Sequence, residues 1–425
     1  MVNNMSVDVS RIEHDIEALA RITEPDRPYT RRVFTPLYQQ GRAYLEERMR
    51  EAGLWTRIDV AGNLIGRRNG TGHDQGQRPG VIMLGSHSDT VPEGGRFDGI
   101  AGIVAALEVA RALSDHGIEL VHDLEVVDFL AEEVSPFGVS CIGSRGMTGH
   151  LPEDWLSRVS AGGTLHTALH DVGGDPKTVL GYRRNDLAAF LELHIEQGPV
   201  LETEHQDIGI VTEIAGISRF EIIIEGRADH AGTTPMQQRC DALLAAAQLV
   251  LEINQNAMAR AATPGHFTAT VGEFSIEPNA ANVVPSRARL LVDARAEYRD
   301  DMQQFAHWLD AAALAVARTH GVRIASLNRL SDNLASPSDA QLLTHLEQAC
   351  RALGASHRRL VSGAGHDAAW LSKITPAAMI FVPSRGGRSH TPEEWTDTSE
   401  IALGAAVLYE TVISLDQARW QPTTI

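Results

Sequence analysis

Histidine and carboxylate side chains recur in this 425-residue chain where apolar, strand-like runs end. His87 closes one such run and stands two residues before Asp89, and His194 closes another. Asp98 follows in the glycine-rich segment GGRFDG, where the backbone can approach a ligand closely. Imidazole nitrogens and carboxylate oxygens are the ligands that zinc, manganese and cobalt take in proteins. The pattern therefore predicts a metal site.

Two adjacent glutamates, Glu132 and Glu133, follow a third apolar run. Neighbouring side chains at a strand end point in different directions, so one carboxylate can bind metal while the other faces a substrate. Asp89 is placed to orient the ring of His87, as metal-bound histidines usually require. His390, in GGRSHTPEEW, supplies a further imidazole. A single histidine is more often a surface or core residue than a ligand, so the prediction depends on the combination.

The elements that would position these residues alternate between strands and helices. Nearly continuous apolar runs at 81–86 and 124–131 are typical of strands buried on both faces of a parallel or mixed sheet, and residues 377–384 also read as a strand. A helix is expected from about 100 to 117, directly after Asp98. In open α/β sheets, ligands bind beyond the carboxyl ends of the strands. We therefore expect the candidate ligands to meet at one edge of the sheet.

A change of pattern in the second half predicts an inserted domain. Residues 214–332 alternate as strand, helix, two strands, helix and a possible last strand, which indicates an α+β two-layer, ferredoxin-like sandwich. A chain of this length exceeds what a single core usually holds. We expect an α/β fold in which residues 1–213 and 333–425 form a mixed-sheet metal-binding catalytic domain around this insert.

The composition excludes several classes of partner. A formal net charge of -18 repels nucleic acid, and no apolar run is long enough to suggest a membrane span. The first fifteen residues lack the basic and apolar pattern of a secretory signal, so a cytoplasmic protein is expected. Cys141, Cys240 and Cys350 are far apart and are expected to be buried thiols. No activating base is evident beside Cys141, which is therefore not expected to be a nucleophile.

The chain also resembles a known family through a set of motifs in a fixed order. These motifs are GSHSDTVPEGGRFDG, the AEE at 131–133, ELHIEQG, ADHAGTTPM, ANVVP, GAGHDA and GGRSHTPEEW. Together they are similar to those of the carbamoylase and allantoate amidohydrolase branch of the dinuclear metallopeptidase and aminoacylase family. The likeness extends from residue 62 to residue 390.

The resemblance implies two divalent metal ions per subunit, with zinc, manganese, cobalt and nickel all compatible with the donor types. It implies that Asp98 bridges the two ions and that Glu132 is the general base. The ligands that it implies are His87 and His194 on one ion, and Glu133 and His390 on the other.

Further roles in substrate binding follow from the same resemblance. It implies that the insert is a lid that forms a homodimer, and that His230 reaches the substrate, in some relatives from the partner subunit. Asn282 and Arg295 correspond to positions that hold the substrate's α-carboxylate, and a guanidinium can bind a carboxylate through two hydrogen bonds. Gln197 resembles a residue that contacts the ureido or amide group. The loop at Gly365 would approach the carboxylate through its backbone.

Structural alternatives remain open for these residues. Arg295 could instead form an ion pair with Asp293 or Glu297. Gln197 could simply form the turn after its strand. The GAGHDA segment could be a helix start that is capped by Asp367.

The resemblance implies hydrolysis of N-carbamoyl-L-amino acids to the amino acid, CO2 and ammonia. The segment SCIGSRGMTG favours this over allantoate hydrolysis, which would use the same ligands. Residues 134–137 depart from the family pattern, so the resemblance does not predict the pocket wall beside Glu132. A dipeptidase or aminoacylase, and a metal-free paralogue that kept only the fold, are the remaining alternatives. The small-molecule substrate is the expected partner, together with a second copy of the chain.

Overall fold

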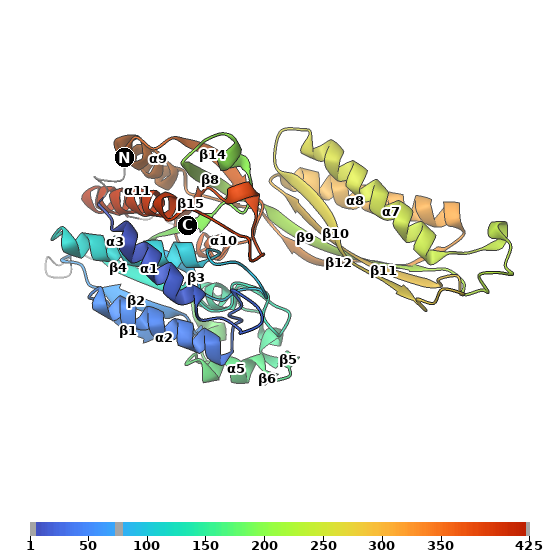
Figure 1. Cartoon of the computed structure of the whole chain (residues 1–425), viewed down its shortest axis with the longest axis horizontal. Coiled ribbons are helices and arrows are strands. Elements are labelled where there is room, and N and C mark those ends of the chain that lie inside the picture. The colour runs from blue at the N-terminus through green and yellow to red at the C-terminus, as the bar shows by residue number, and fades with distance from the viewer. Residues whose placement is uncertain (1–5, 73–79, 422–425) are drawn as a thin grey trace. The chain divides into compact units, whose positions relative to one another are not determined.

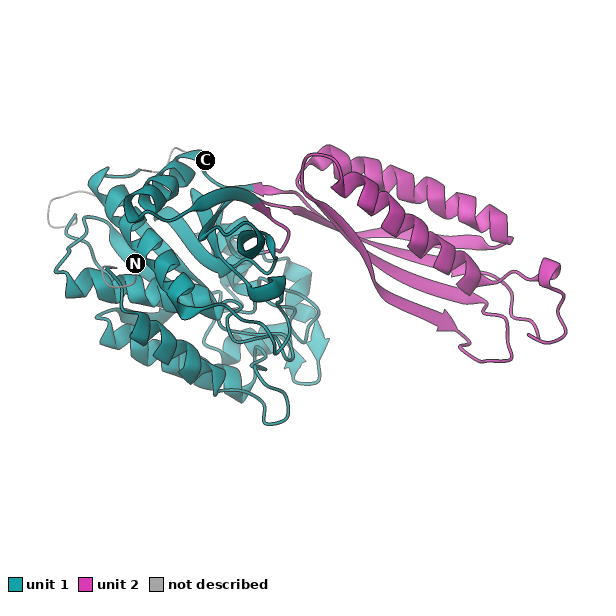
Figure 2. Ribbon diagram, turned by 45° about the horizontal axis from the view of Figure 1, so that its top comes forward, with its two compact units in different colours: residues 1–212, 337–360, 366–425 teal, residues 213–336, 361–365 magenta. Residues whose placement is uncertain are grey.

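The computed structural model describes residues 6–72 and 80–421, which form two compact units (Figures 1 and 2). The first five residues, which entered the prediction about a secretory signal, lie outside the described residues. The first unit comprises residues up to 212, 337–360 and 366–425, and the second comprises 213–336 and 361–365.

These boundaries differ from the sequence-based ones by Glu213, which joins the second unit, and by two short segments. Asn333 belongs to the second unit because the last strand of that unit extends to it, and residues 334–336 follow this strand directly. Residues 361–365 also join it, and there the N–H of Ala215 donates to the carbonyl of Ser362 at 2.9 Å.

The first unit is built on a mixed sheet. The strand order among the described residues is β1-β2-β4-β3-β7-β15-β8-β13, with β14 paired to β8. The bounds are β1 (Trp55–Ile58), β2 (Leu64–Arg68), β3 (Val81–His87), β4 (Asp123–Phe129), β7 (Leu187–Ile195), β8 (Ile208–Ile214), β13 (Ser336–Pro337), β14 (His357–Ser362) and β15 (Ala377–Val382). A separate short hairpin pairs β5 (Val159–Ser160) with β6 (Gly163–Thr164).

The centre of this sheet is parallel. β3 runs parallel to β4 and to β7, and β15 runs parallel to β7. Every residue of these four strands is buried, and the strands expected at the largely apolar runs are confirmed. Parallel strands end at a common edge, so the residues that follow them are brought together there.

Helices cover the sheet of the first unit. α3 packs against β3, β4 and β7, and α1 and α11 pack against α3. The bounds are α1 (Val9–Ala20), α2 (Pro36–Glu51), α3 (Ile100–Asp115), α4 (Ile142–Thr148), α5 (Leu165–Asp171), α6 (Val200–Thr203), α9 (Ala340–Leu353), α10 (Ala368–Leu371) and α11 (Thr398–Gln417). The helix expected after Asp98 is α3.

α11 is apolar enough, by length and mean hydropathy, to resemble a membrane span. No run of this kind was predicted from the sequence. Most of this helix is buried, and it packs against α3 and α9. Burial in the protein core therefore accounts for its composition.

The second unit is the expected α+β sandwich. Its antiparallel sheet has the strand order β10-β11-β9-β12, and α7 and α8 pack side by side on the sheet. The bounds are β9 (Gly216–Glu225), α7 (Ala242–Ala261), β10 (Phe267–Glu277), β11 (Arg287–Ala296), α8 (Arg299–His320) and β12 (Arg323–Asn333). A separate apolar core, centred on Phe305, Leu290 and Leu249, joins the helices to the sheet. The order βαββαβ is that of a ferredoxin-like fold.

Candidate metal centre

The candidate ligands gather at the edge where the parallel strands end. His87 is the last residue of β3, and His194 is the next-to-last residue of β7. Asp98 directly precedes Gly99, the residue at the amino end of α3. A Cβ added at Gly99 would lie 2.3 Å from the backbone oxygen of His87 and 2.6 Å from its ring. Glycine is therefore required for α3 to begin this close to the histidine.

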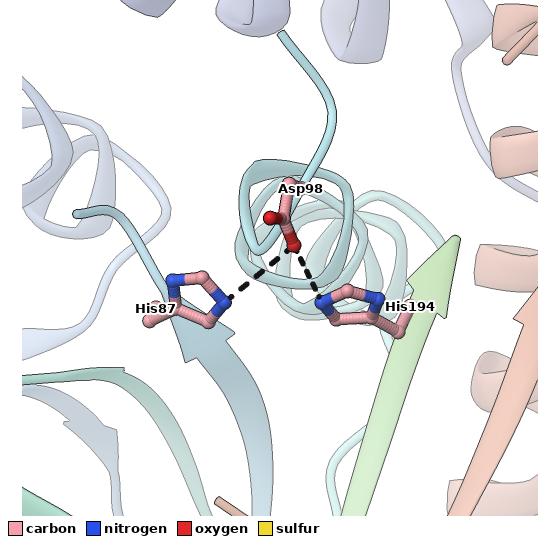
Figure 3. Close-up of side chains that lie close together, drawn as sticks. All are labelled: His87, Asp98 and His194. Carbon is pink, nitrogen blue, oxygen red and sulfur yellow. Dashed lines mark ion pairs between the residues drawn. The ribbon is translucent and has the colours of Figure 1, made fainter. Parts of the chain in front are cut away.

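Asp98 lies between two imidazole rings (Figure 3). Its Oδ1 is 3.1 Å from Nε2 of His194 and 3.8 Å from Nε2 of His87. Its Oδ2 is 3.0 Å from Nε2 of His390, which is also 3.2 Å from Oε1 of Glu133. Two groups of three possible ligands result, His87–Asp98–His194 and Asp98–Glu133–His390. Asp98 is common to both groups and faces each with a different oxygen.

Backbone carbonyls determine which nitrogen of the two buried rings faces Asp98. Nδ1 of His87 is 3.0 Å from the carbonyl oxygen of Asp89, and Nδ1 of His194 is 2.9 Å from that of Ile195. A carbonyl can only accept, so Nδ1 carries the proton and Nε2 keeps a lone pair in the neutral ring. The carboxylate of Asp89 is farther from the ring of His87, at 3.6 Å. The ring-orienting contact expected of Asp89 is thus made mainly by its backbone.

Glu132 and Glu133 lie in a loop, which corrects their placement at the end of a strand. β4 ends at Phe129, because the side-chain oxygen of Asn63 accepts the N–H of Leu130 at 3.0 Å and takes it out of the sheet. The two glutamates therefore point in directions set by a loop and not by strand alternation.

The buried carboxylate of Asp89 holds this loop in place. Its Oδ1 accepts the N–H of Glu132 and its Oδ2 accepts the N–H of Glu133, each at 3.2 Å. The side chain of Glu132 approaches the ligands, with Oε2 3.8 Å from Nε2 of His87. Glu132 therefore lies beside the ligand groups and belongs to neither of them.

The electrostatics of the cluster favour positive charge among its carboxylates. Hydrogen bonds to Asp98 and Glu133 raise the pKa of His390 to about 11. Burial opposes the negative charge of Asp98, but hydrogen bonds with His194 and His390 outweigh it and hold the pKa of Asp98 well below its usual value. Burial, with the nearby charge of Glu133, raises the pKa of Glu132 well above its usual value. Carboxylates packed this closely require compensating positive charge.

Both groups fit divalent cations. The ligand atoms of each group lie within 4.8 Å of one another, and each group combines imidazole nitrogen with carboxylate oxygen. This donor set is typical of zinc, manganese, cobalt and nickel sites. Cations would also provide the positive charge that the carboxylates require.

Hydrogen bonds join the loops that carry the ligands. Gln197 donates from Nε2 to Oγ of Ser389 at 3.0 Å, and the same nitrogen is 3.4 Å from Oδ1 of Asp98. Ser389 donates to Oε2 of Glu394 at 2.7 Å, and Oε1 of Glu394 accepts the N–H of Asp98 at 3.1 Å. Ser389 and Glu394 were not predicted from the sequence. Their proximity to His390 in GGRSHTPEEW was the only local signal.

The GAGHDA segment contributes a third buried imidazole, that of His366. The ring centroid of His366 lies 4.6 Å from that of His194, with the rings edge to face. The side chain of Asp367 accepts a hydrogen bond from the hydroxyl of Ser144 and makes none to the start of α10. The helix start expected at this segment is present, since α10 begins directly after Asp367, but the side chain of Asp367 does not cap it.

The second unit brings two of the predicted substrate residues together. His230 and Asn282 are exposed and lie in adjacent segments, because the N–H of Ala231 donates to the carbonyl of Asn282 at 2.9 Å. Nδ1 of His230 accepts the N–H of Gly232 at 3.0 Å. In the neutral ring the proton is then on Nε2, which leaves an exposed N–H donor.

Arg295 lies in β11, beside the loop that contains Gly365. Its Nη1 donates to the carbonyl of Gly363 at 2.8 Å, and its Nε donates to Oδ1 of Asp293 at 2.8 Å. The ion pair with Asp293 that was the structural alternative is thus present. Glu297 instead accepts the N–H of His266.

Cys141 lies beside Glu132 at the start of α4. Its Sγ is 3.6 Å from Oε1 of Glu132, and burial raises the pKa of this thiol well above its usual value. A neutral thiol is a poor nucleophile, in agreement with the expectation for this residue. Cys350 is buried as expected, whereas Cys240 is only partly buried.

Comparisons with known proteins agree with this site. A family model described as peptidase family M20/M25/M40 matches residues 83–414. An N-carbamoyl-L-amino acid amidohydrolase of Geobacillus stearothermophilus is 39% identical over 93% of this chain and 95% of the relative. An allantoate amidohydrolase of Bacillus subtilis (strain 168) is 35% identical over 94% of this chain and 96% of the relative.

A solved structure shows the same similarity in three dimensions. An amidase of the hydantoinase/carbamoylase family from Burkholderia multivorans aligns with a TM-score of 0.85 at 36% identity, over 96% of this chain and 98% of that chain. The two chains share one fold over almost their whole lengths, in agreement with the family that the sequence motifs indicate. The chain therefore belongs to peptidase family M20/M25/M40 and, within that family, to the amidohydrolase branch of the carbamoylases and allantoate amidohydrolases.

Proposed function

We propose that this chain hydrolyses the ureido C–N bond of N-carbamoyl-L-amino acids to the amino acid, CO2 and ammonia, with two divalent metal ions as cofactors. The observation that carries the proposal is the position of Glu132, which lies beside two ligand groups that share Asp98 and is a member of neither. A carboxylate that is not needed as a ligand can serve as a base next to the metal centre.

In the proposed reaction, the bound ions, Glu132 and His230 have separate roles. Bound divalent ions supply a water of lowered pKa and polarise the ureido carbonyl. Glu132 takes the proton of the attacking water and returns it to the departing nitrogen, and the carbamic acid that remains breaks down to CO2 and the second amine. Burial raises the pKa of Glu132 above its usual value, and a carboxylate with a raised pKa is a better proton acceptor than an ordinary one. The Nε2–H of His230 would donate a hydrogen bond to the oxyanion.

Substrate recognition is proposed to use the remaining predicted residues. Arg295 and Asn282, with the backbone near Gly365, would hold the α-carboxylate. One nitrogen of Arg295, Nη2, makes no hydrogen bond among the described contacts, so the guanidinium keeps a donor for a ligand. Gln197 would contact the ureido group, since its amide lies among the ligand loops.

The test is a substrate panel on protein reconstituted with zinc, manganese or cobalt. We expect ammonia release from N-carbamoyl-L-amino acids, with no cleavage of dipeptides. Ammonia release from allantoate alone would instead support the second candidate, allantoate hydrolysis. That candidate is favoured by the relative in Bacillus subtilis and would use the same ligands. Cleavage of dipeptides without ammonia release would contradict both.

We also propose that the second unit forms a homodimer. α7 exposes three large apolar side chains spaced seven residues apart, Leu244, Leu251 and Met258, which are 53%, 63% and 67% exposed. Residues at this spacing lie close to one line along a helix and form a stripe suited to packing against a second copy.

A further inference from the structure

Glu394 is a buried carboxylate that links two loops carrying metal ligands. It is 1% exposed. Its Oε1 accepts the N–H groups of Phe97 and Asp98, at 2.8 and 3.1 Å, and its Oε2 accepts the hydroxyl of Ser389 at 2.7 Å. Asp98 is a candidate ligand, and Ser389 directly precedes the candidate ligand His390. One side chain thus touches the backbone of one ligand and the neighbour of another.

Gln197 closes these contacts into a ring of hydrogen bonds. Its Nε2 donates to Oγ of Ser389 at 3.0 Å and lies 3.4 Å from Oδ1 of Asp98. The ring therefore runs from the side chain of Asp98 through Gln197, Ser389 and Glu394 back to the backbone of Asp98. Polar contacts that close on themselves in a buried region fix the geometry of all members together.

The surrounding backbone is shaped to admit the Glu394 carboxylate. A Cβ at Gly95 would lie 2.3 Å from Oε1 of Glu394, and Gly95 has a φ of +106°, which favours glycine. A buried carboxylate costs free energy unless it is fully hydrogen-bonded, and both oxygens of Glu394 are bonded. The fold therefore accommodates this carboxyl group at a specific place beside the ligand loops.

His390 depends on such support more than the other imidazoles do. Its side chain is 49% exposed, whereas those of His87 and His194 are buried. Its backbone has a φ of +54°, in the left-handed region that a non-glycine residue rarely adopts. Packing alone does not hold an exposed ring in one orientation, so the loop beneath it must be anchored.

We propose that Glu394 is a positioning residue for the second ligand group, Asp98–Glu133–His390. It holds the His390 loop against the Asp98 loop, so that the three ligand atoms stay close enough to bind one ion. The inference rests on the proposed dinuclear centre but not on the identity of the substrate.

The test measures metal binding and not activity. Metal-free wild type, Glu394→Ala and Glu394→Gln are titrated with Mn²⁺ or Co²⁺ by equilibrium dialysis. We expect two ions per chain in wild type. In Glu394→Ala we expect one ion to bind as in wild type and the other to bind about 10- to 100-fold more weakly, the usual effect of removing a partner of a metal ligand. Glu394→Gln keeps an acceptor for the backbone N–H groups. Its affinity for the more weakly bound ion should therefore lie between those of wild type and Glu394→Ala.

A matched control separates positioning from general destabilisation. Asp416 is also a buried carboxylate that accepts two consecutive backbone N–H groups, those of Val121 and His122 at 2.9 and 2.8 Å. Asp416→Asn should leave both metal affinities unchanged. If Glu394→Ala does not fold, Ser389→Ala serves in its place, because it cuts the link to the His390 loop and keeps the contact with Asp98.

A double variant tests whether Glu394 acts through the second ligand group. His390→Ala removes a ligand of the second group, so adding Glu394→Ala to it should cause little further loss of affinity. Additive losses in the double variant, or two ions bound at wild-type affinity in both Glu394→Ala and Ser389→Ala, would overturn the role of Glu394. Fewer than two ions in wild type would instead contradict the dinuclear centre itself.

Discussion

The carboxylate of Asp89 accepts the backbone N–H of Glu132 at 3.2 Å, across 43 positions of the chain. Its other oxygen accepts the N–H of Glu133 at the same distance. The backbone carbonyl of Asp89 meanwhile accepts from the ring of His87. Asp89 thereby positions the proposed base, Glu132, and one ligand from each ligand group, His87 and Glu133.

Replacing this carboxylate should impair both metal binding and turnover. In Asp89→Asn an amide N–H faces one of the two loop N–H groups, and leaving a buried donor unpaired costs about 1–3 kcal/mol. We expect a loss of kcat together with weaker metal binding, measured by steady-state kinetics and by metal analysis after dialysis. Asp339→Asn is the control, because Asp339 accepts two consecutive N–H groups at the start of α9, at 2.9 Å each, and contacts no candidate ligand. Equal effects of the two substitutions would count against this role of Asp89.

The parts of the fold with a strong local signal could be predicted from the sequence. β3, β4 and β15 are buried on both faces, so apolar residues predominate in them and the strands are recognisable from the sequence. The placement of Glu132 at a strand end was wrong, because β4 is ended by a hydrogen bond from Leu130 to Asn63, 67 positions away. No local pattern encodes such a contact.

The same limit explains what was missed around the metal centre. His87 and Asp98 stand in a dense motif of histidine, aspartate and glycine, whose chemistry is visible from residue types alone. Glu394 is one of two adjacent glutamates in HTPEEW, and its neighbour Glu393 is exposed. Only the approach of residues 95–98, nearly 300 positions earlier, distinguishes the buried glutamate from the exposed one.

Replacing Asp98 or Glu132 by alanine should have opposite effects on the metal content of the protein. Asp98→Ala removes the residue common to both ligand groups, so we expect loss of both ions. Glu132→Ala should retain both ions and lose turnover by about 10²–10⁴-fold, the usual contribution of a general base. Measuring metal content by mass spectrometry and turnover by ammonia release distinguishes a metal ligand from a general base. Equal loss of metal in both variants would show that Glu132 is itself a ligand.

His230 should affect turnover without affecting metal content. Removing one donor to an oxyanion costs about 10²–10³-fold in rate, which is the loss expected for His230→Ala. A mixture of the inactive variants His230→Ala and Glu132→Ala, dissociated and allowed to reassociate, tests where this histidine acts. If His230 serves the partner subunit, one site of each mixed dimer has both residues and activity returns. A mixture that stays inactive indicates that each subunit uses its own His230.

Arg295→Lys should raise KM more than it lowers kcat. Lysine cannot reproduce the fork that now bonds Asp293 and the carbonyl of Gly363. We expect KM to rise about tenfold, the equivalent of one hydrogen bond to a charged group. Asp293→Asn breaks the same ion pair and leaves the guanidinium in place. If this variant matches Arg295→Lys in KM, the ion pair and not substrate binding explains the effect.

A charge in the apolar stripe of α7 should weaken the proposed homodimer. Leu251 is the central residue of the stripe and is 63% exposed, so Leu251→Glu should not disturb the core of the unit. We expect dimeric wild type and a concentration-dependent shift to monomer in the variant, measured by sedimentation velocity. Glu252→Gln, at the next position of the same helix, is the control. A wild type that is monomeric at all concentrations would contradict the proposal.

The unequal exposure of the three imidazoles has a kinetic consequence. His87 and His194 are buried, whereas half of the His390 side chain faces solvent. A chelator in solution can compete for the ligands around His390 without any opening of the fold, but it must wait for local opening to reach the other pair. Metal removal should therefore follow two exponential phases. Only the slower phase should lengthen when the first unit is stabilised.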